Sequence, residues 1–156
     1  MKYHFINNQK HMKHIAISCD HAGFELKEHV KKVLDEKGYQ VEDFGPSTAE
    51  RMDYPDAIHP LAKAINDGKI EWGIIICGSG NGVAMTANKY ANVRAGIAWT
   101  PELAELTRQH NDANILSLPA RFISEEVALA CIDKFLTTDF EGGRHATRVD
   151  KIAISC

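Results

Sequence analysis

The stretch WGIIICGSGNG, residues 72–82, decides the fold of this protein. Its first six residues are almost entirely apolar and include three consecutive isoleucines, a pattern typical of a β-strand buried on both faces. The glycine-rich half, Gly78 to Gly82, leads into VAMTANKY (83–90), where we expect a helix. Strands covered on both faces belong to parallel sheets packed between helices, so this stretch predicts an α/β protein.

The rest of the chain repeats the same alternation of strand and helix. Apolar or alternating runs predict strands at 14–19, 39–44, 72–77, 92–99 and 113–119. Apolar spacing and capping residues predict the other helices. The first has Leu26, Val30, Val33 and Leu34 on one face and ends at Gly38, and the second spans 55–66. A third begins at Thr100-Pro101-Glu102, a fourth is capped by Ser124, and a last one spans about 145–154. At Pro60 we expect a regular helix to start or to kink. Five alternations predict a five-stranded parallel sheet with helices on both faces.

Composition limits the class of protein. The chain has 156 residues and a net charge of −3, with 44% hydrophobic and 25% charged residues, which fits one globular domain. The acidic balance gives no support for a nucleic-acid binder with a broad basic face. The longest apolar tract, GIIIC, is far shorter than the ~18–20 residues of a membrane span. The start is polar, without the apolar core of a secretory signal. We expect residues 1–11 to be a disordered extension and residues 12–156 to form the single domain.

Cysteine and histidine usage points away from metal sites. Cys19, Cys77, Cys131 and Cys156 form no CxxC pair, which favours reduced thiols in a cytoplasmic protein. The eight histidines are scattered and show no HExxH or comparable ligand spacing. The sequence therefore predicts no metal and no other cofactor.

Three βα loops carry candidate chemistry, because ligands of parallel sheets bind beyond the carboxyl ends of the strands. The loop Gly78-x-Gly80-x-Gly82 fits neither GxGxxG nor a GK[ST] P-loop, so it is either an anion cradle or only a tight turn. Cys77, at the end of the strand and near a helix N-terminus, is a candidate base or nucleophile; the alternative is an inert core thiol. Ser79 could donate a hydrogen bond or satisfy only its own turn.

Polar residues gather at two further places. In the first loop, Asp20 and His21 follow the first strand, although Asp20 could simply cap the next helix. His110 and Asn111 end a helix just before the fifth strand, where a histidine also complements the helix dipole. Cys19 is interpreted as a buried bystander.

The segment after Gly142-Gly143 is basic. Arg144 and Arg148, four residues apart, share a helix face, which opposes the helix unless an anion lies between them. Because arginine suits bidentate phosphate contacts, this pair predicts a phosphate site; the alternative is a solvated charged face. Arg121 is either a further anion contact or a surface residue.

Six separated motifs resemble ribose-5-phosphate isomerase type B, in the same order. They are CDHAGFELK (19–27), DYP (53–55), GIIICGSGNG (73–82), ANK (87–89), RQHNDAN (108–114) and EGGRHATRV (141–149), and the match covers about residues 12–154. The same superfamily includes galactose-6-phosphate and allose-6-phosphate isomerases. The resemblance implies a Rossmann-like three-layer α/β/α sandwich, a homodimer or tetramer with sites shared between subunits, and metal-free aldose–ketose isomerisation.

The resemblance also implies roles for individual residues. Cys77 matches the base that moves a proton between C2 and C1, the backbone of Gly78, Gly80, Asn81 and Gly82 matches the anion hole for the enediolate, and Ser79 matches the residue that assists at the oxygens. Asp20 and His110 match the pair that opens the furanose ring. Substrate and phosphate contacts match His21, Tyr54, Asn111, Arg121, Arg144 and Arg148.

These features together lead us to expect a cytoplasmic isomerase of D-ribose 5-phosphate and D-ribulose 5-phosphate, acting in the pentose phosphate pathway. A thiolate base, fixed N–H donors for the developing oxyanion and a clamped phosphate supply what this proton transfer requires. A hexose-6-phosphate isomerase is the nearest alternative, because the sequence does not measure the distance between Cys77 and the arginines. A non-catalytic phosphate- or nucleotide-binding module is a further alternative, but it leaves Cys77, Asp20 and His110 without a shared purpose.

Overall fold

A computed structural model describes residues 13–154 of the chain. The expected extension at 1–11, the proposed start at Met12 and Cys156 lie outside the described residues. The strands are β1 (His14–Cys19), β2 (Gln40–Asp43), β3 (Trp72–Cys77), β4 (Ala95–Ile97) and β5 (Ile115–Pro119). The helices are the short 3-10 turn η1 (His21–Gly23), α1 (Phe24–Glu36), α2 (Tyr54–Asn66), α3 (Asn81–Ala87), α4 (Pro101–Asn111), α5 (Glu125–Thr137) and α6 (Arg144–Asp150).

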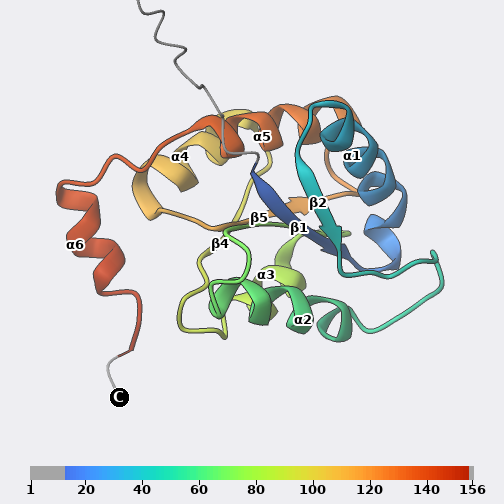
Figure 1. Ribbon diagram of the computed structural model, residues 1–156, viewed down its shortest axis with the longest axis horizontal. Helices are drawn as coiled ribbons and strands as arrows, with labels where there is room; N and C mark the ends of the chain where they lie inside the picture. Colours follow the sequence, from blue (N-terminus) through green and yellow to red (C-terminus); the bar gives the residue numbers. More distant parts are fainter. Residues whose placement is uncertain (1–12, 155–156) are drawn as a thin grey trace, which may run out of the picture.

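The five strands form one parallel sheet, as predicted, and the structure gives the strand order β2-β1-β3-β5-β4. Helices α1, α4 and α5 cover one face and α2 and α3 cover the other, so the molecule has three layers (Figure 1). β1 leads to α1 on one face and β3 leads to α3 on the opposite face, so the chain direction diverges after these two neighbouring strands. In open parallel sheets such a switch point is where ligands bind. The first and third loops of the sequence follow these two strands.

Each face of the sheet has its own apolar core. On one side Leu26, Val30 and Phe135 pack on the sheet, and on the other Ile58 and Val83 do so. All six residues of β3 are buried, as the WGIIIC run predicted. Removing a fully buried leucine- or isoleucine-sized side chain from such a core typically costs about 2–5 kcal/mol, so both layers are needed to hold the strand tips in place.

The predicted fourth strand, 92–99, is too long: β4 spans only Ala95–Ile97 at the edge of the sheet. Next to its free edge, the Asn88 side chain donates to the carbonyl of Ala95 and accepts from its N–H, at 3.0 and 2.8 Å. A side chain thus satisfies the edge groups that a further strand would otherwise pair with. Asn114 holds the preceding residues in a similar way, accepting from the N–H of Arg94 at 2.8 Å.

Other boundaries also differ from the sequence predictions. Helix α2 begins at Tyr54 and continues past Pro60, so a start near that proline is wrong. Pro55 suits the first turn, and the buried apolar face of α2 outweighs the hydrogen bond that Pro60 removes. The last helix ends at Asp150 rather than near 154, and β5 begins at Ile115 rather than at 113. The predicted caps are confirmed: Thr100 accepts from Leu103 N and Ser124 from Val127 N.

Candidate functional site

Cys77 lies at the carboxyl tip of β3, under the first turn of the glycine-rich loop. Its side chain is buried, and its sulfur accepts a hydrogen bond from the N–H of Gly80 at 3.1 Å. Gly80 has a φ of +76°, a conformation that only glycine adopts at little cost, and this turn directs its N–H back toward the sulfur. On the other side, buried Ser117 donates to the Gly80 carbonyl at 2.7 Å. The peptide groups on both sides of the Gly80 Cα are therefore held in place.

The remainder of the loop presents polar groups at the same tip. Ser79 Oγ accepts from Asn81 N at 3.3 Å, and α3 begins at Asn81. Beyond the strands, the N–H groups of Ala120 and Arg121 donate to the carbonyls of Cys77 and Gly78, at 2.8 and 3.1 Å. These bonds continue the β3–β5 ladder into the loop.

The first loop lies against the third. Asp20 is 7% exposed, and its carboxylate accepts from Gly23 N at 3.1 Å, so it does cap the following turn. A Cβ on Gly23 would lie 2.7 Å from the carbonyl oxygen of Ile76, so this close approach requires glycine. His21 Nδ1 accepts from Met52 N at 3.5 Å. The loops that carry Asp20 and Cys77 are thus in direct contact.

Tyr54 and Arg121 flank the glycine-rich loop. A Cβ on Gly82 would lie 2.6 Å from the Tyr54 ring, and one on Gly78 would lie 3.2 Å from Arg121 Cδ. Tyr54 comes from the start of α2 and Arg121 from the turn after β5, and both are exposed. With Cys77, Ser79, Asp20, His21 and the loop backbone, they form the set of predicted residues that we call the carboxyl-end group.

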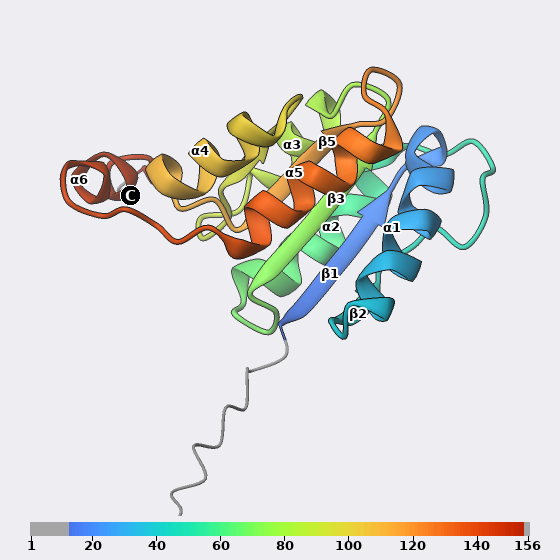
Figure 2. The same ribbon diagram turned by 90° about the horizontal axis from the view of Figure 1, so that it is seen from above.

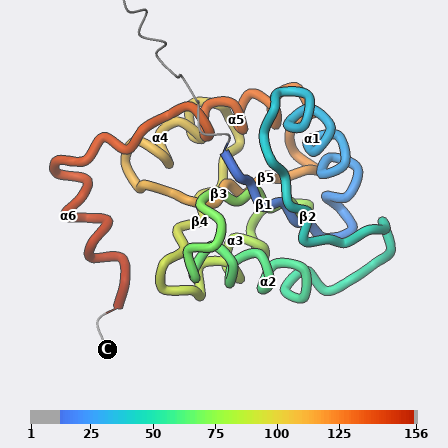
Figure 3. The backbone as a smooth tube through the Cα atoms, viewed as in Figure 1, coloured from blue at the N-terminus to red at the C-terminus, as the bar shows by residue number. Residues whose placement is uncertain are grey.

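The other predicted residues lie elsewhere in the chain. His110 and Asn111 end α4, which runs back toward the amino ends of the strands, and Arg144 and Arg148 lie on α6 beyond it (Figure 2). In Figure 3 the chain leaves α5, passes α4 and turns into α6, away from the tips of β1 and β3. We call these four residues the amino-end group. One chain therefore does not bring His110 to Asp20, the partner that the sequence analysis gave it.

Two residues that the sequence analysis did not single out join His110. The imidazole of His145 stacks on that of His110, with centroids 4.2 Å apart and an interplanar angle of 9°, and His110 Nε2 lies 3.7 Å from Glu141 Oε2. Glu141 and His145 are four residues apart, a spacing that could have drawn attention, but their distance from His110 in the sequence hid the cluster. Burial, and then the neighbouring His110, lowers the pKa of His145.

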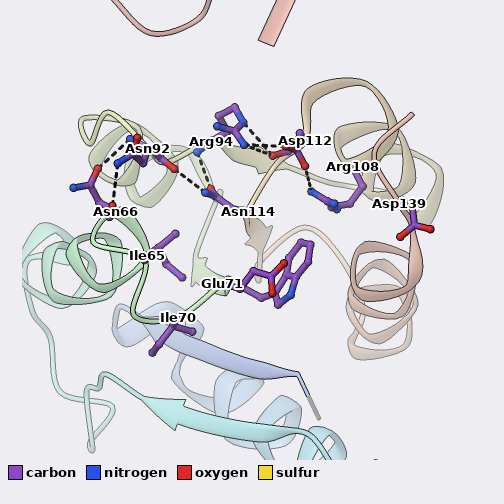
Figure 4. Close-up of a pocket in the computed structure, with 12 residues that line it drawn as sticks. Ile65, Asn66, Ile70, Glu71, Asn92, Arg94, Arg108, Asp112, Asn114 and Asp139 are labelled. Carbon is purple, nitrogen blue, oxygen red and sulfur yellow. Dashed lines mark hydrogen bonds and ion pairs between the residues drawn. The ribbon is translucent and has the colours of Figure 1, made fainter. Parts of the chain in front are cut away.

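A hollow of about 720 Å³ opens at the amino ends of the strands, and none of the predicted site residues lines it (Figure 4). Several of its polar groups have partners within the fold. Asp112 binds Arg94 at 3.2 Å and Arg108 at 2.9 Å, and the Arg108 guanidinium lies 4.5 Å from the centroid of the Trp72 ring. We interpret this hollow as part of the scaffold.

The other described thiols are core residues. Burial raises the pKa of Cys19 to about 12 and that of Cys131 to about 11. Both therefore remain protonated at neutral pH, which agrees with their interpretation as bystanders.

The fold is an open parallel α/β sheet with a thiol under a glycine-rich loop and with acid, imidazole, phenol and guanidinium groups around it. In this class of protein the strand tips are the usual place for a small polar ligand. A family model described as Ribose/Galactose Isomerase matches residues 15–152. The chain belongs to this family.

The chain aligns with individual relatives along nearly their whole length. Ribose-5-phosphate isomerase B of Escherichia coli is 43% identical over 141 residues, covering 90% of this chain and 95% of the relative. A crystal structure of a ribose 5-phosphate isomerase from Thermotoga maritima superposes with a TM-score of 0.89 at 46% identity, covering 92% of this chain and 99% of that one. Ribose-5-phosphate isomerase B from Mycoplasma genitalium, solved with bound ribulose-5-phosphate, gives a TM-score of 0.86 at 40% identity and covers 89% of this chain and 93% of that one.

Proposed function

We propose that this protein interconverts D-ribose 5-phosphate and D-ribulose 5-phosphate, with Cys77 as the base. The observation that carries the assignment of the base is the Cys77 sulfur at the tip of β3, 3.1 Å from the Gly80 N–H. The substrate is supported by relatives of 40–46% identity that bear the name ribose-5-phosphate isomerase, one of them with the ketose bound.

The chemistry is a proton transfer between neighbouring carbons. The Cys77 thiolate removes the proton from C2 of the open-chain aldose and returns it to C1, while the hydroxyl proton on O2 moves to O1 with the help of Ser79. In the enediolate between these steps, negative charge develops on oxygen. Backbone N–H groups of Gly78–Gly82 meet that charge, and each well-placed donor of this kind is worth about 3–4 kcal/mol. Because one base serves both carbons, the Cys77 thiolate is restored at the end of each reaction.

Ring opening and phosphate binding need both groups of residues. Asp20 and His21 belong to the carboxyl-end group, and His110, Arg144 and Arg148 to the amino-end group. We therefore propose a homodimer in which the amino-end group of one subunit completes the carboxyl-end group of the other. His110 then joins Asp20 to open the furanose ring, while the arginines hold the phosphate and orient C1 and C2 against the sulfur.

Exposed apolar side chains near the strand tips support this dimer. Trp99 is 44% exposed and Phe122 59%, and their rings lie 5.0 Å apart on the segments after β4 and β5. Leu103, in the first turn of α4, is 45% exposed, and Met85 on α3 is 67% exposed. A group of large apolar side chains next to a functional loop is typical of a protein–protein contact.

We also place the reaction in the cytoplasm, because Cys19, Cys77 and Cys131 are free thiols. Within residues 13–154, no helix has the length and apolar character needed to cross a membrane.

The test is turnover of ribose 5-phosphate, measured beside allose 6-phosphate and galactose 6-phosphate. We expect the pentose phosphate to have the highest kcat/KM. Cys77→Ala should lower kcat by about 10²–10⁴-fold with little change in KM, since it removes the base but leaves the phosphate contacts. Arg148→Ala should instead raise KM at least about tenfold. Cys131→Ala, which removes a buried thiol on α5, is the matched control and should keep the wild-type kcat.

The outcomes separate the alternatives. Higher kcat/KM for a hexose phosphate would assign the chain to the hexose-phosphate branch of its family. Retention of most of kcat in Cys77→Ala would contradict the base. Turnover of none of the three sugars, with ribose 5-phosphate still bound, would favour the non-catalytic module.

A further inference from the structure

We propose that His110, Glu141 and His145 form a site for a divalent cation of the zinc class, and that occupation of this site inhibits the enzyme. One atom from each side chain can be chosen so that all three lie within 4.8 Å of one another. Two imidazole nitrogens and one carboxylate oxygen are a set of three protein ligands that binds Zn²⁺ and leaves its fourth position open. The inhibitory part rests on the function proposed above for His110, whereas the binding part does not.

The backbone builds this cluster. Glu141 N donates to the carbonyl of Gln109 at 3.0 Å, which fixes the segment before α6 against the end of α4. Gly142 and Gly143, with φ of +69° and +56°, then reverse the chain. The first turn of α6 is thereby placed over His110. His110 comes from the end of α4, Glu141 from the segment before α6, and His145 from the first turn of α6.

His145 supplies an independent sign of a missing ligand. Its side chain is 5% exposed, and its Nε2 is, within residues 13–154, a buried side-chain nitrogen without a hydrogen-bond partner. Leaving such an atom unpaired costs roughly 1–3 kcal/mol, which a bound cation would remove.

The charges around the cluster select the kind of cation. Arg144 and Arg148 both act on His145 and oppose any cation, and Glu141 offsets only one of these charges. Mg²⁺ and Ca²⁺ depend on charge and oxygen ligands, so this site does not suit them. Zn²⁺, Co²⁺ and Ni²⁺ gain from imidazole nitrogens, and the proposal is restricted to this class.

Binding requires His110 to move. The two rings are parallel, so their lone pairs do not meet at one ion unless one ring turns. His110 has a 39% exposed side chain and is the one free to do so. Once its nitrogen binds the metal, that nitrogen no longer exchanges a proton with the sugar ring. Loss of activity then follows from loss of His110, with Cys77 unchanged.

A second pair in the molecule provides a matched control. His29 Nε2 lies 3.8 Å from Glu125 Oε2, with side chains 39% and 62% exposed, against 3.7 Å, 39% and 58% for His110 and Glu141. The two pairs differ in that His110 has His145 stacked on it. If a histidine beside a glutamate were sufficient, both pairs would bind zinc. If the third ligand matters, only the cluster with His145 does.

The experiment is a titration of the full-length protein, freed of metals, with Zn²⁺ by calorimetry and with Co²⁺ by visible absorption. We expect the wild type to bind one cation per chain. His145→Asn and Glu141→Gln should each raise Kd at least about tenfold, whereas His29→Asn should keep the wild-type Kd. Cobalt should show the visible bands of a tetrahedral nitrogen/oxygen site without a thiolate charge-transfer band, and it should bind Cys77→Ala unchanged.

Other results would overturn the proposal. They are equal Zn²⁺ affinity of His145→Asn and the wild type, loss of the site in His29→Asn, or a thiolate band that disappears in Cys77→Ala. Inhibition of ribose 5-phosphate turnover is measured separately, and Zn²⁺ should inhibit the wild type more strongly than Glu141→Gln. If the chain turned over no sugar phosphate, the binding titration would still decide the metal site.

Discussion

A single residue, Gly80, connects the scaffold to the proposed chemistry. Its N–H donates to the Cys77 sulfur and its carbonyl accepts from Ser117, so the position of one N–H depends on a side chain in the neighbouring strand. Both bonds require the φ of +76°. An added Cβ would also lie 3.2 Å from Ser117 Oγ and 3.4 Å from Ile97 Cγ2. A glycine is therefore needed here for conformation and for space.

We expect Gly80→Ala to lower the free energy of unfolding by about 1–2 kcal/mol and kcat at least about tenfold, because the peptide must rotate away from the sulfur. Gly68 provides the control. It has a φ of +72°, nothing within 4 Å of an added Cβ, and a place at the end of α2 outside the proposed site. Gly68→Ala should lower the free energy of unfolding by a similar amount and keep the wild-type kcat. Urea unfolding and steady-state kinetics measure both; equal kcat in the two variants would contradict the role of the Gly80 peptide.

At the scale of elements, an ion-pair network joins α1 to the end of β2. Lys27 has a fully buried side chain, and its Nζ lies 2.6 Å from Asp43 Oδ2 and 3.0 Å from Glu28 Oε1. Lys31 Nζ reaches the same Asp43 oxygen at 2.6 Å. Burial raises the pKa of Asp43, but hydrogen bonds from Lys27 and Lys31 outweigh it, so the net pKa is below its ordinary value. The charge of the buried Lys27 is therefore balanced by the carboxylates of Asp43 and Glu28.

Asp43→Asn should lower the free energy of unfolding by about 2–3 kcal/mol, somewhat less than the about 3–5 kcal/mol of a fully buried pair because Glu28 still contacts Lys27. Asp67→Asn, which breaks the exposed Lys63–Asp67 pair of 2.7 Å, is the control and should leave the urea midpoint almost unchanged.

The ion pair between Lys27 and Asp43 also predicts a pH dependence of stability. Since the pKa of Asp43 is lowered by folding, its contribution is complete above its unfolded value of about 3.9 and is lost as the pH falls through the lower folded value. Acid unfolding of Asp43→Asn should lack this share of the pH dependence. An identical acid transition in the variant and the wild type would contradict the assignment.

At the scale of the whole molecule, the decisive feature is the separation of the two groups of residues. Cys77 and Asp20 lie at the strand tips, and His110 and the arginines lie at the far end of α4 and on α6. The parallel sheet imposes this separation, because each connecting helix returns the chain from the carboxyl ends of the strands to their amino ends.

If sites are shared between subunits, mixing two inactive variants should restore activity. Random dimers of Cys77→Ala and His110→Asn chains contain one intact site in half of all dimers, so about a quarter of the wild-type activity is expected. The control mixes Cys77→Ala with Asp20→Asn, two changes within the carboxyl-end group, and should restore nothing. Lack of recovery in the first mixture would show that His110 does not act across a subunit boundary.

Much of this could be predicted from the chain alone, because the relevant signals are local. Continuous burial of WGIIIC, capping by Thr100 and Ser124 and the spacing of Ile58, Leu61 and Ile65 depend on neighbours within a few residues, and all are confirmed. The errors in the predicted boundaries occur where contacts outside the local sequence pattern determine the structure. Strand β4 is shortened beside the Asn88 side chain, and Pro60 is tolerated because the rest of α2 is anchored in the core.

The sequence by itself determined the parallel α/β architecture and the placement of a thiol, an acid and a glycine loop at the ends of strands, since hydrophobic period and turn chemistry are written in consecutive residues. Only the tertiary structure decided which of these side chains meet. It aimed the Gly80 N–H at Cys77, kept His110 away from Asp20, and stacked it on His145 next to Glu141. The physical reason is that such meetings depend on how elements pack across the sheet, and packing joins residues whose separation along the chain carries no periodic signal.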